Sequence, residues 1–187
     1  IKLTQSPASL RALEFSVPAE QAVEFGHARL RITWDGRKQP SVDAPVALFF
    51  GAGTLYNRDG REFLVKGFPM NIRFTGQRAH LACYFPMPYQ KRARMVLAAA
   101  PHQAIKGLQW RVRVLPYTDP ANWVGYFHAT YVDHGVPEPG KDLVFLGPGG
   151  RNSDTLGVVM RFIPIDRQPQ RAGLDAIAHD AAHRFNL

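Results

Sequence analysis

Asp43 is the carboxylate with the most unusual surroundings in this chain of 187 residues. It stands in the largely apolar run Pro-Ser-Val-Asp-Ala-Pro at residues 40–45. A carboxylate among apolar neighbours is costly unless it is paired or hydrogen-bonded. Asp43 is therefore either part of a binding subsite or a structural group that caps a turn or pairs with an arginine, and the structural role is favoured. Asp59 and Glu62, in and just after a turn, are interpreted as solvated loop acids.

Aromatic residues are a second group of candidates for ligand binding, because the face of an aromatic ring can stack on a sugar. Core packing is the stronger expectation for any single ring. The candidate rings are Tyr56, Tyr84, Tyr89, Trp123 and Tyr126. The substrate-binding residues that we select from the whole chain are Asp43, Tyr56, Tyr84 and His128.

His128, Asp133 and His134 raise the question of a metal site. In a strand, His128 and His134 would share one face and Asp133 would point to the other. We therefore expect no metal site and interpret His128 primarily as a strand histidine with its own hydrogen-bond partner. The sequence contains no serine nucleophile elbow, phosphate-binding loop or dinucleotide fingerprint. No cofactor is expected, and no catalytic residue can be named.

The elements that would position these side chains are short strands separated by turn residues. Residues 28–34 read Ala-Arg-Leu-Arg-Ile-Thr-Trp, which places apolar and polar side chains on opposite faces. Residues 108–115 alternate in the same way, with Trp110 predicted to point inward and Arg111 outward. The run at residues 42–50 is more continuously apolar, which is typical of a strand buried on both faces. Further strands are expected at residues 10–17, 63–74 (two strands), 78–85, 93–99, 124–132 and 142–146.

Eight or nine such strands fit an all-β, jelly-roll β-sandwich, which uses eight strands in two sheets. We expect no helix before residue 165. Residues 171–185 are a candidate short C-terminal helix, because their apolar side chains recur at the helical period after Pro169.

The formal net charge of +8 raises the question of nucleic acid. The basic residues are dispersed, and only residues 91–94 form a cluster. No zinc-finger spacing, RNP-type motif or basic helix accompanies them, so a nucleic-acid partner is disfavoured. No apolar run is long enough for a membrane helix. No signal peptide is visible, which leaves the compartment unknown. Cys83 is the single cysteine and is expected to be a small buried hydrophobe.

Three stretches go beyond a generic β-sandwich. The first comprises residues 40–45 and the following Leu-Phe-Phe-Gly-Ala-Gly at 48–53. The second is Cys-Tyr-Phe-Pro-Met-Pro-Tyr at residues 83–89, followed by Ala-Arg-Met at 93–95. The third is Gly-Tyr-Phe-His-Ala-Thr-Tyr at residues 125–131, followed by Pro-Glu-Pro-Gly-Lys-Asp at 137–142. In this order and spacing they resemble glycoside hydrolase family 172, long described as domain of unknown function 2961, over roughly residues 9–146.

The resemblance implies two jelly rolls in tandem and assembly as trimers or multiples of trimers. It also implies activity on fructofuranosyl or arabinofuranosyl linkages, with the catalytic carboxylates in the second jelly roll. The chain departs from the family pattern at Ala47-Leu48, where Gly-Asp is usual, and at Arg92, where a serine is usual. From about Gly147 the resemblance stops.

We therefore divide the chain into a jelly-roll domain at residues 1–147 and a divergent tail at 148–187. The tail has two candidate origins, natural truncation with a replacement segment or a reading-frame shift. The first functional hypothesis is a truncated or single-domain relative of these hydrolases with little activity alone. The alternative is a carbohydrate-binding or structural assembly module. Carbohydrate is a candidate partner, and a homo-oligomer is expected.

Overall fold

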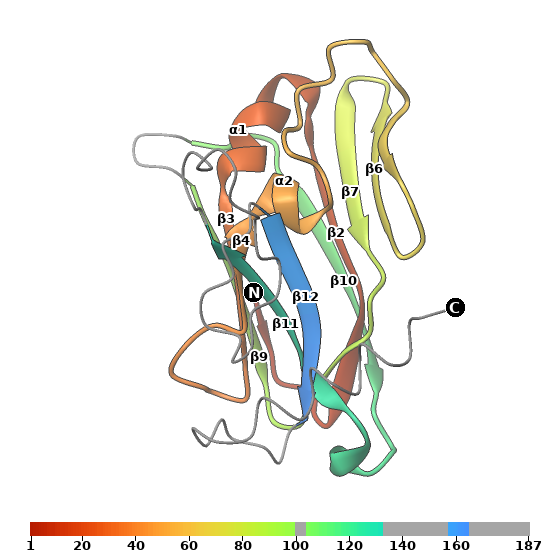
Figure 1. Cartoon of the computed structure of the whole chain (residues 1–187). Helices are drawn as coiled ribbons and strands as arrows, with labels where there is room; N and C mark the ends of the chain where they lie inside the picture. The colour runs from red at the N-terminus through yellow and green to blue at the C-terminus, as the bar shows by residue number, and fades with distance from the viewer. Residues whose placement is uncertain (100–103, 133–156, 165–187) are drawn as a thin grey trace, which may run out of the picture.

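The computed structural model describes residues 1–99, 104–132 and 157–164, and within them the chain forms two β-sheets packed face to face. Figure 1 shows the two layers edge-on, with α1 (Ala22–His27) and α2 (Val46–Phe49) in the upper part of the sandwich. The all-β jelly-roll sandwich predicted from the sequence is confirmed, with the two sheets as its layers.

We call the first layer sheet A. Its strands, in spatial order, are β1 (Lys2–Leu3), β9 (Ala93–Ala98), β3 (Arg29–Trp34), β4 (Val42–Pro45), β11 (Gly125–Val132) and β12 (Gly157–Pro164). Neighbouring strands are antiparallel except for β4 and β11, which run parallel. Parallel neighbours need a long connection, and here it includes most strands of the second layer and β9 of the first.

We call the second layer sheet B, and it is antiparallel throughout. Its strands, in spatial order, are β10 (Gln109–Pro116), β2 (Ala8–Pro18), β7 (Arg78–Cys83), β6 (Met70–Thr75) and β5 (Phe63–Lys66), while β8 (Met87–Tyr89) pairs with the start of β2. The helical turns are η1 (Ala19–Gln21), α1 (Ala22–His27), α2 (Val46–Phe49) and η2 (Ala121–Trp123).

The core follows from strand alternation. In β3, Leu30, Ile32 and Trp34 are buried and the residues between them face outward. The Trp34 ring stacks on Tyr89, with ring centroids 6.2 Å apart, and its indole N–H donates to the carbonyl oxygen of Phe127 at 2.8 Å. This hydrogen bond satisfies the polar edge of a fully buried ring and ties β3 to β11.

A turn at the end of β3 forms a hydrogen-bonded corner around Asp35. Asp35 and Gly36 both have positive φ, at 52° and 74°, a conformation that aspartate and glycine tolerate best. The Asp35 carboxylate accepts the backbone N–H groups of Gln90, Lys91 and Arg92 and the hydroxyl of Tyr126. One side chain therefore joins the β3 turn, the β8–β9 loop and β11.

Three expectations are corrected by the structure. The run at residues 42–50 is not one strand, because β4 ends at Pro45 and α2 follows, burying Val46, Ala47 and Phe49. Helices also occur before residue 165, since α1 covers the end of the sandwich with Phe25 buried. Trp110 does not point into a closed core: its strand β10 lies at the sheet edge, and the residue is 53% exposed.

Two further expectations lie outside the described residues, namely the strand at 142–146 and the helix at 171–185. The division at residue 147 stays a prediction. Within the segment assigned to the tail, β12 pairs with β11 along eight residues and extends sheet A.

Candidate functional site

The outward face of sheet B carries an open groove with a volume of about 680 Å³. Alternation along β2 produces it, since Leu13, Phe15 and Val17 are buried while Glu14 and Ser16 point the other way. Side chains from three further strands, β6, β7 and β10, complete the lining, which includes Asn71, Arg73, Thr75, His80, Tyr84, Gln109 and Arg111. The groove therefore combines these polar side chains with apolar surface from Phe15, Leu81 and Trp110, and its floor is the sheet itself.

Tyr84 and Glu14 form the most connected part of this groove. The Tyr84 hydroxyl donates to Glu14 Oε1 at 3.3 Å, and Arg111 Nε lies 3.2 Å from Glu14 Oε2. Burial raises the pKa of Tyr84, and the Glu14 carboxylate raises it further. The phenol consequently stays protonated at neutral pH, with its ring available as a half-buried wall of the groove.

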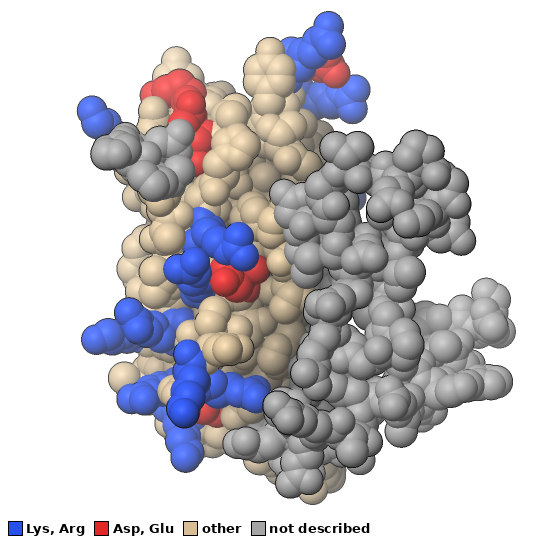
Figure 2. Space-filling view, turned by 60° about the vertical axis from the view of Figure 1, so that its left-hand side comes forward, with Lys and Arg blue, Asp and Glu red and all other residues tan. Residues whose placement is uncertain are grey.

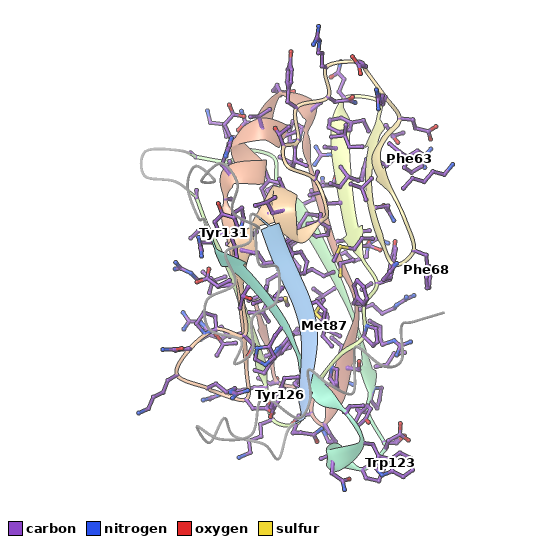
Figure 3. The ribbon with its side chains drawn as sticks, in the orientation of Figure 1. Phe63, Phe68, Met87, Trp123, Tyr126 and Tyr131 are labelled. Carbon is purple, nitrogen blue, oxygen red and sulfur yellow. The ribbon has the colours of Figure 1, made fainter. Side chains whose placement is uncertain are left out.

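A second hollow of about 550 Å³ continues the groove toward the β5–β6 hairpin. It shares Asn71, Arg73 and Tyr84 with the first hollow, so the two are continuous. Its outer end is formed by Phe63 and Phe68, which Figure 3 shows on the hairpin side of sheet B. Phe68 is 95% exposed, so its ring face is accessible to a ligand that lies in this hollow.

Cations hold the ring of Phe63 in place. Arg73 and Lys66 place their charges 5.5 Å and 5.3 Å from the centre of this ring. Arg73 also forms an ion pair with Glu62, at 2.8 Å between Nη2 and Oε1. The hairpin end of the groove thus combines two aromatic faces with a fixed guanidinium group.

His80 lies on β7 and lines the first hollow. Burial lowers its pKa, and the nearby Arg78 and Arg73 lower it further. A neutral imidazole, which can both donate and accept a hydrogen bond, is therefore favoured at neutral pH.

Glu14 is the one carboxylate among the described residues that line either hollow, and Glu62, which lies beside the groove, is far from it. Glu14 is on β2 and leans toward Arg111 on β10, whereas Glu62 precedes β5 and leans toward Arg73. Two strands lie between their backbones, so three strand spacings separate them by about 14 Å across the sheet. Glycoside hydrolysis by paired carboxyl groups requires about 5–10 Å. Among the described residues that line the groove, no such pair is present.

The structure brings one of the four selected substrate-binding residues, Tyr84, into the groove. Asp43 lies on the outward face of sheet A, where Arg29 and Arg31 both bind its carboxylate, so the favoured pairing with arginine is observed. Tyr56 is in the loop after α2 and is 62% exposed. His128 is on β11, half-buried in sheet A.

Sequence reasoning did not select Glu14, Asn71, Arg73 or His80. The alternation of β2 would have identified Glu14 as outward-facing. The convergence of four strands on one groove depends on sheet order, which no local pattern contains. Within the described part of the chain, no group of three or more His, Cys, Asp or Glu could hold a metal ion. The described helices are all too short or too polar to cross a bilayer.

Comparison with known families places this geometry in context. A family model described as GH172 domain-like matches residues 3–112, which is more than half of the chain. The chain belongs to this GH172 domain-like family. The resemblance drawn from the sequence motifs is thereby confirmed for the N-terminal portion. A search of curated proteins gave no match.

The matched segment of this GH172-like chain contains the whole candidate site. Every residue that lines either hollow lies between residues 3 and 112. Strands β11 and β12 of sheet A lie beyond the match. The groove is thus a feature of the part that carries the family likeness.

Proposed function

We propose that this GH172-like domain binds a carbohydrate chain along the groove of sheet B and hydrolyses it little or not at all on its own. The observation that carries the proposal is the continuity of the groove through Tyr84, a ring shared by both hollows. A sugar is recognised by aromatic faces together with a few placed polar groups, which is the usual composition of a ligand site.

The shape of the groove favours a chain over a single sugar. The lining residues come from all five strands between β10 and β5. Four strand spacings give a width of about 19 Å, which exceeds one sugar ring. Phe63 and Phe68 stand at one end of this path and Tyr84 in its middle, so rings are available at successive positions.

The arrangement of acids supports binding over hydrolysis. Glu14 is engaged by Tyr84 and Arg111, and Glu62 by Arg73. Neither faces a second carboxylate across a space where a glycosidic bond could lie. Hydrolysis would need a partner carboxylate from outside the described residues or from another protein chain.

The family suggests which sugars to test. Glycoside hydrolases that this chain resembles act on fructofuranosyl or arabinofuranosyl linkages, so fructans and arabinans are the first ligands to examine. The proposed activity of the purified chain is binding to such a polymer with little release of reducing sugar.

A second candidate function is assembly into a homo-oligomer, a trimer or a multiple of trimers. The edge strand β10 favours it, because Leu115 is 50% exposed there and Trp110, which also lines the groove, is 53% exposed. Exposed apolar groups on a sheet edge are typical of surfaces that pair with another chain. Light scattering of the purified chain, with a Leu115→Lys variant, tests this proposal: a monomeric wild type would overturn it.

Isothermal titration of the full chain with fructan and arabinan oligosaccharides tests the proposed binding function. Phe68→Ala and Tyr84→Ala should each weaken binding about tenfold, as the loss of a ring contact of about 1.4 kcal/mol implies. The matched controls are Tyr56→Ala and Trp123→Ala, which remove exposed rings outside the groove, and Asp43→Asn. Equal losses in the control variants, or efficient release of sugar by the wild-type chain, would overturn the proposal.

A further inference from the structure

A concentration of positive charge lies at one end of sheet A, on the layer opposite the groove. Figure 2 shows Lys and Arg side chains gathered on the lower part of this face. We call this surface the cationic end, and define it by the residues Lys2, Arg37, Lys38, Lys91, Arg92 and Arg94.

The register of sheet A brings these charges together from separate parts of the sequence. Lys2 on β1 stands directly opposite Arg94 on β9, and Arg94 stands opposite Thr33 on β3. Like charges at directly opposed positions destabilise a sheet. The opposed cations Lys2 and Arg94 therefore lower the stability of the fold, and a bound anionic ligand would restore it.

The turns next to β3 and β9 fix the other members. Lys91 and Arg92 belong to the loop whose backbone N–H groups bind Asp35. The Arg92 guanidinium packs so closely on Gly36 that an added Cβ would lie 2.5 Å from its Nη2. Arg37 rests over the ring of Tyr126, 5.3 Å from its centre. These cations are therefore held in position by the fold rather than carried on a free loop.

The acidic residues near the cationic end do not neutralise its positive charge. Within the described part of the chain, no member of the cationic end forms an ion pair with a carboxylate. Asp35 lies beneath, but its oxygens are occupied by three N–H groups and the Tyr126 hydroxyl. Asp43, on the same face, is bound by Arg29 and Arg31. Among the described residues, the six cations thus surround a single, internally bonded carboxylate.

We propose that the cationic end is a second binding surface, and that its ligand is an acidic polysaccharide carrying sulfate or carboxylate groups. Repeated anionic groups along a chain match a row of cations that crosses several strands. A nucleic acid fits less well, because single-strand binding relies on exposed rings for base stacking. The rings beneath the cationic end, Trp34, Tyr89 and Tyr126, are 0%, 0% and 7% exposed, and the exposed Trp123 lies on η2, outside the residues that define this surface.

Dextran sulfate and uncharged dextran, each labelled with a fluorophore, are the probes for this surface. Fluorescence anisotropy of the full chain should show binding to dextran sulfate that weakens as salt rises, since exposed charges are screened. Uncharged dextran should not bind there. The double variant Lys91→Glu/Arg94→Glu should lower the affinity for dextran sulfate at least tenfold.

This variant is expected to fold, because Arg94 is exposed and Arg94→Glu places a carboxylate opposite Lys2. Circular dichroism checks this directly. The matched control is Arg58→Glu/Arg61→Glu, which makes the same change in net charge at exposed loop positions and should alter affinity less than twofold. If both double variants lose affinity equally, attraction is by net charge alone and the proposed site is wrong.

Single-stranded DNA of similar charge completes the test, because tighter binding of DNA than of dextran sulfate would overturn the choice of ligand. Binding of dextran sulfate at the cationic end can be tested separately from binding of neutral sugars in the groove of sheet B. Phe68→Ala should leave dextran sulfate binding unchanged, and Lys91→Glu/Arg94→Glu should leave the binding of neutral furanoside chains unchanged.

Discussion

The hydroxyl of Tyr126 donates a 2.6 Å hydrogen bond to the carboxylate of Asp35, a residue that lies 91 positions earlier in the chain. The same carboxylate accepts three consecutive backbone N–H groups from residues 90–92. Hydrogen bonds to an ionised acceptor are shorter and stronger than neutral ones. Asp35 therefore closes the end of sheet A and holds in place the loop that carries part of the cationic end.

Asp35→Asn tests how much this corner contributes to stability. Asparagine tolerates the positive φ of this position, so the substitution removes the charge without straining the turn. We expect the free energy of unfolding to fall by about 2 kcal/mol, because one amide nitrogen would face donors and the remaining bonds would lose their charge. Urea denaturation followed by circular dichroism measures the change.

A double-mutant cycle with Tyr126→Phe isolates the bond itself. The two single changes should sum to about 1 kcal/mol more than the loss in the double variant, because both remove the same interaction. If the losses in free energy of unfolding of the two single variants add up to the loss in the double variant, the predicted coupling between Asp35 and Tyr126 is wrong. Asp59→Ala is the matched control for loss of a turn carboxylate. Asp59 and its partner Arg61 are largely exposed, and the expected change is below about 0.5 kcal/mol.

Acid should unfold the protein through the same residue. Burial raises the pKa of Asp35, but the hydrogen bonds from Tyr126 and from the N–H groups of residues 90–92 outweigh it and hold that pKa below its ordinary value of 3.8. A carboxyl group whose pKa is lowered in the folded state stabilises the fold above the unfolded pKa. That contribution is lost as the pH falls through the folded pKa.

The melting temperature should therefore drop more steeply below pH 3.8 for the wild type than for Asp35→Asn. Differential scanning calorimetry between pH 7 and pH 2.5 measures this difference. Parallel profiles for the two proteins would show that another group governs acid unfolding. The pKa of His80 is also lowered from its ordinary value of 6.5, so His80 contributes a loss of stability as the pH falls below that value. Both proteins retain His80, and its contribution cancels in the comparison.

Cys83 should be inert in the folded protein. The residue is fully buried, and burial raises the pKa of its thiol to about 12. Because the thiolate is the reacting form, labelling by a thiol reagent at pH 8 should be slow in buffer and fast in denaturing urea. A mass spectrum of the labelled protein reads the result. Rapid labelling without urea would show that the sandwich opens locally around β7.

The sequence predicted the elements whose patterns are local. Alternation in β3 correctly identified Leu30, Ile32 and Trp34 as core residues. The apolar run at residues 42–50 could not be resolved in the same way, since a continuous apolar stretch fits a buried strand or a buried helix equally well. β4 ends at Pro45, and α2 starts at the next residue. The strand stops there because proline has no backbone N–H to continue the hydrogen-bond ladder.

Features that depend on sheet order could not be predicted. The alternation around Trp110 correctly predicted a strand. The exposure of Trp110, however, follows from the position of β10 at the edge of sheet B. Tyr84 was selected as a binding residue, whereas Glu14, its hydrogen-bond partner, is 70 residues away in the chain. The strand that ends at Trp34 was predicted, but the donors to the Asp35 carboxylate in the turn after it come from a loop and a strand that only the folded topology brings near.

The indole of Trp34 reaches the backbone of Phe127 across 93 residues, and this has a consequence for how the protein is made. Contacts between distant parts of a chain form slowly, because loop-closure entropy must be overcome before they stabilise anything. During synthesis, sheet A lacks β11 until its last residues have left the ribosome. The edge of β4 that pairs with β11 stays open for that interval, so aggregation through this edge is a greater hazard to the nascent chain than to the finished sandwich.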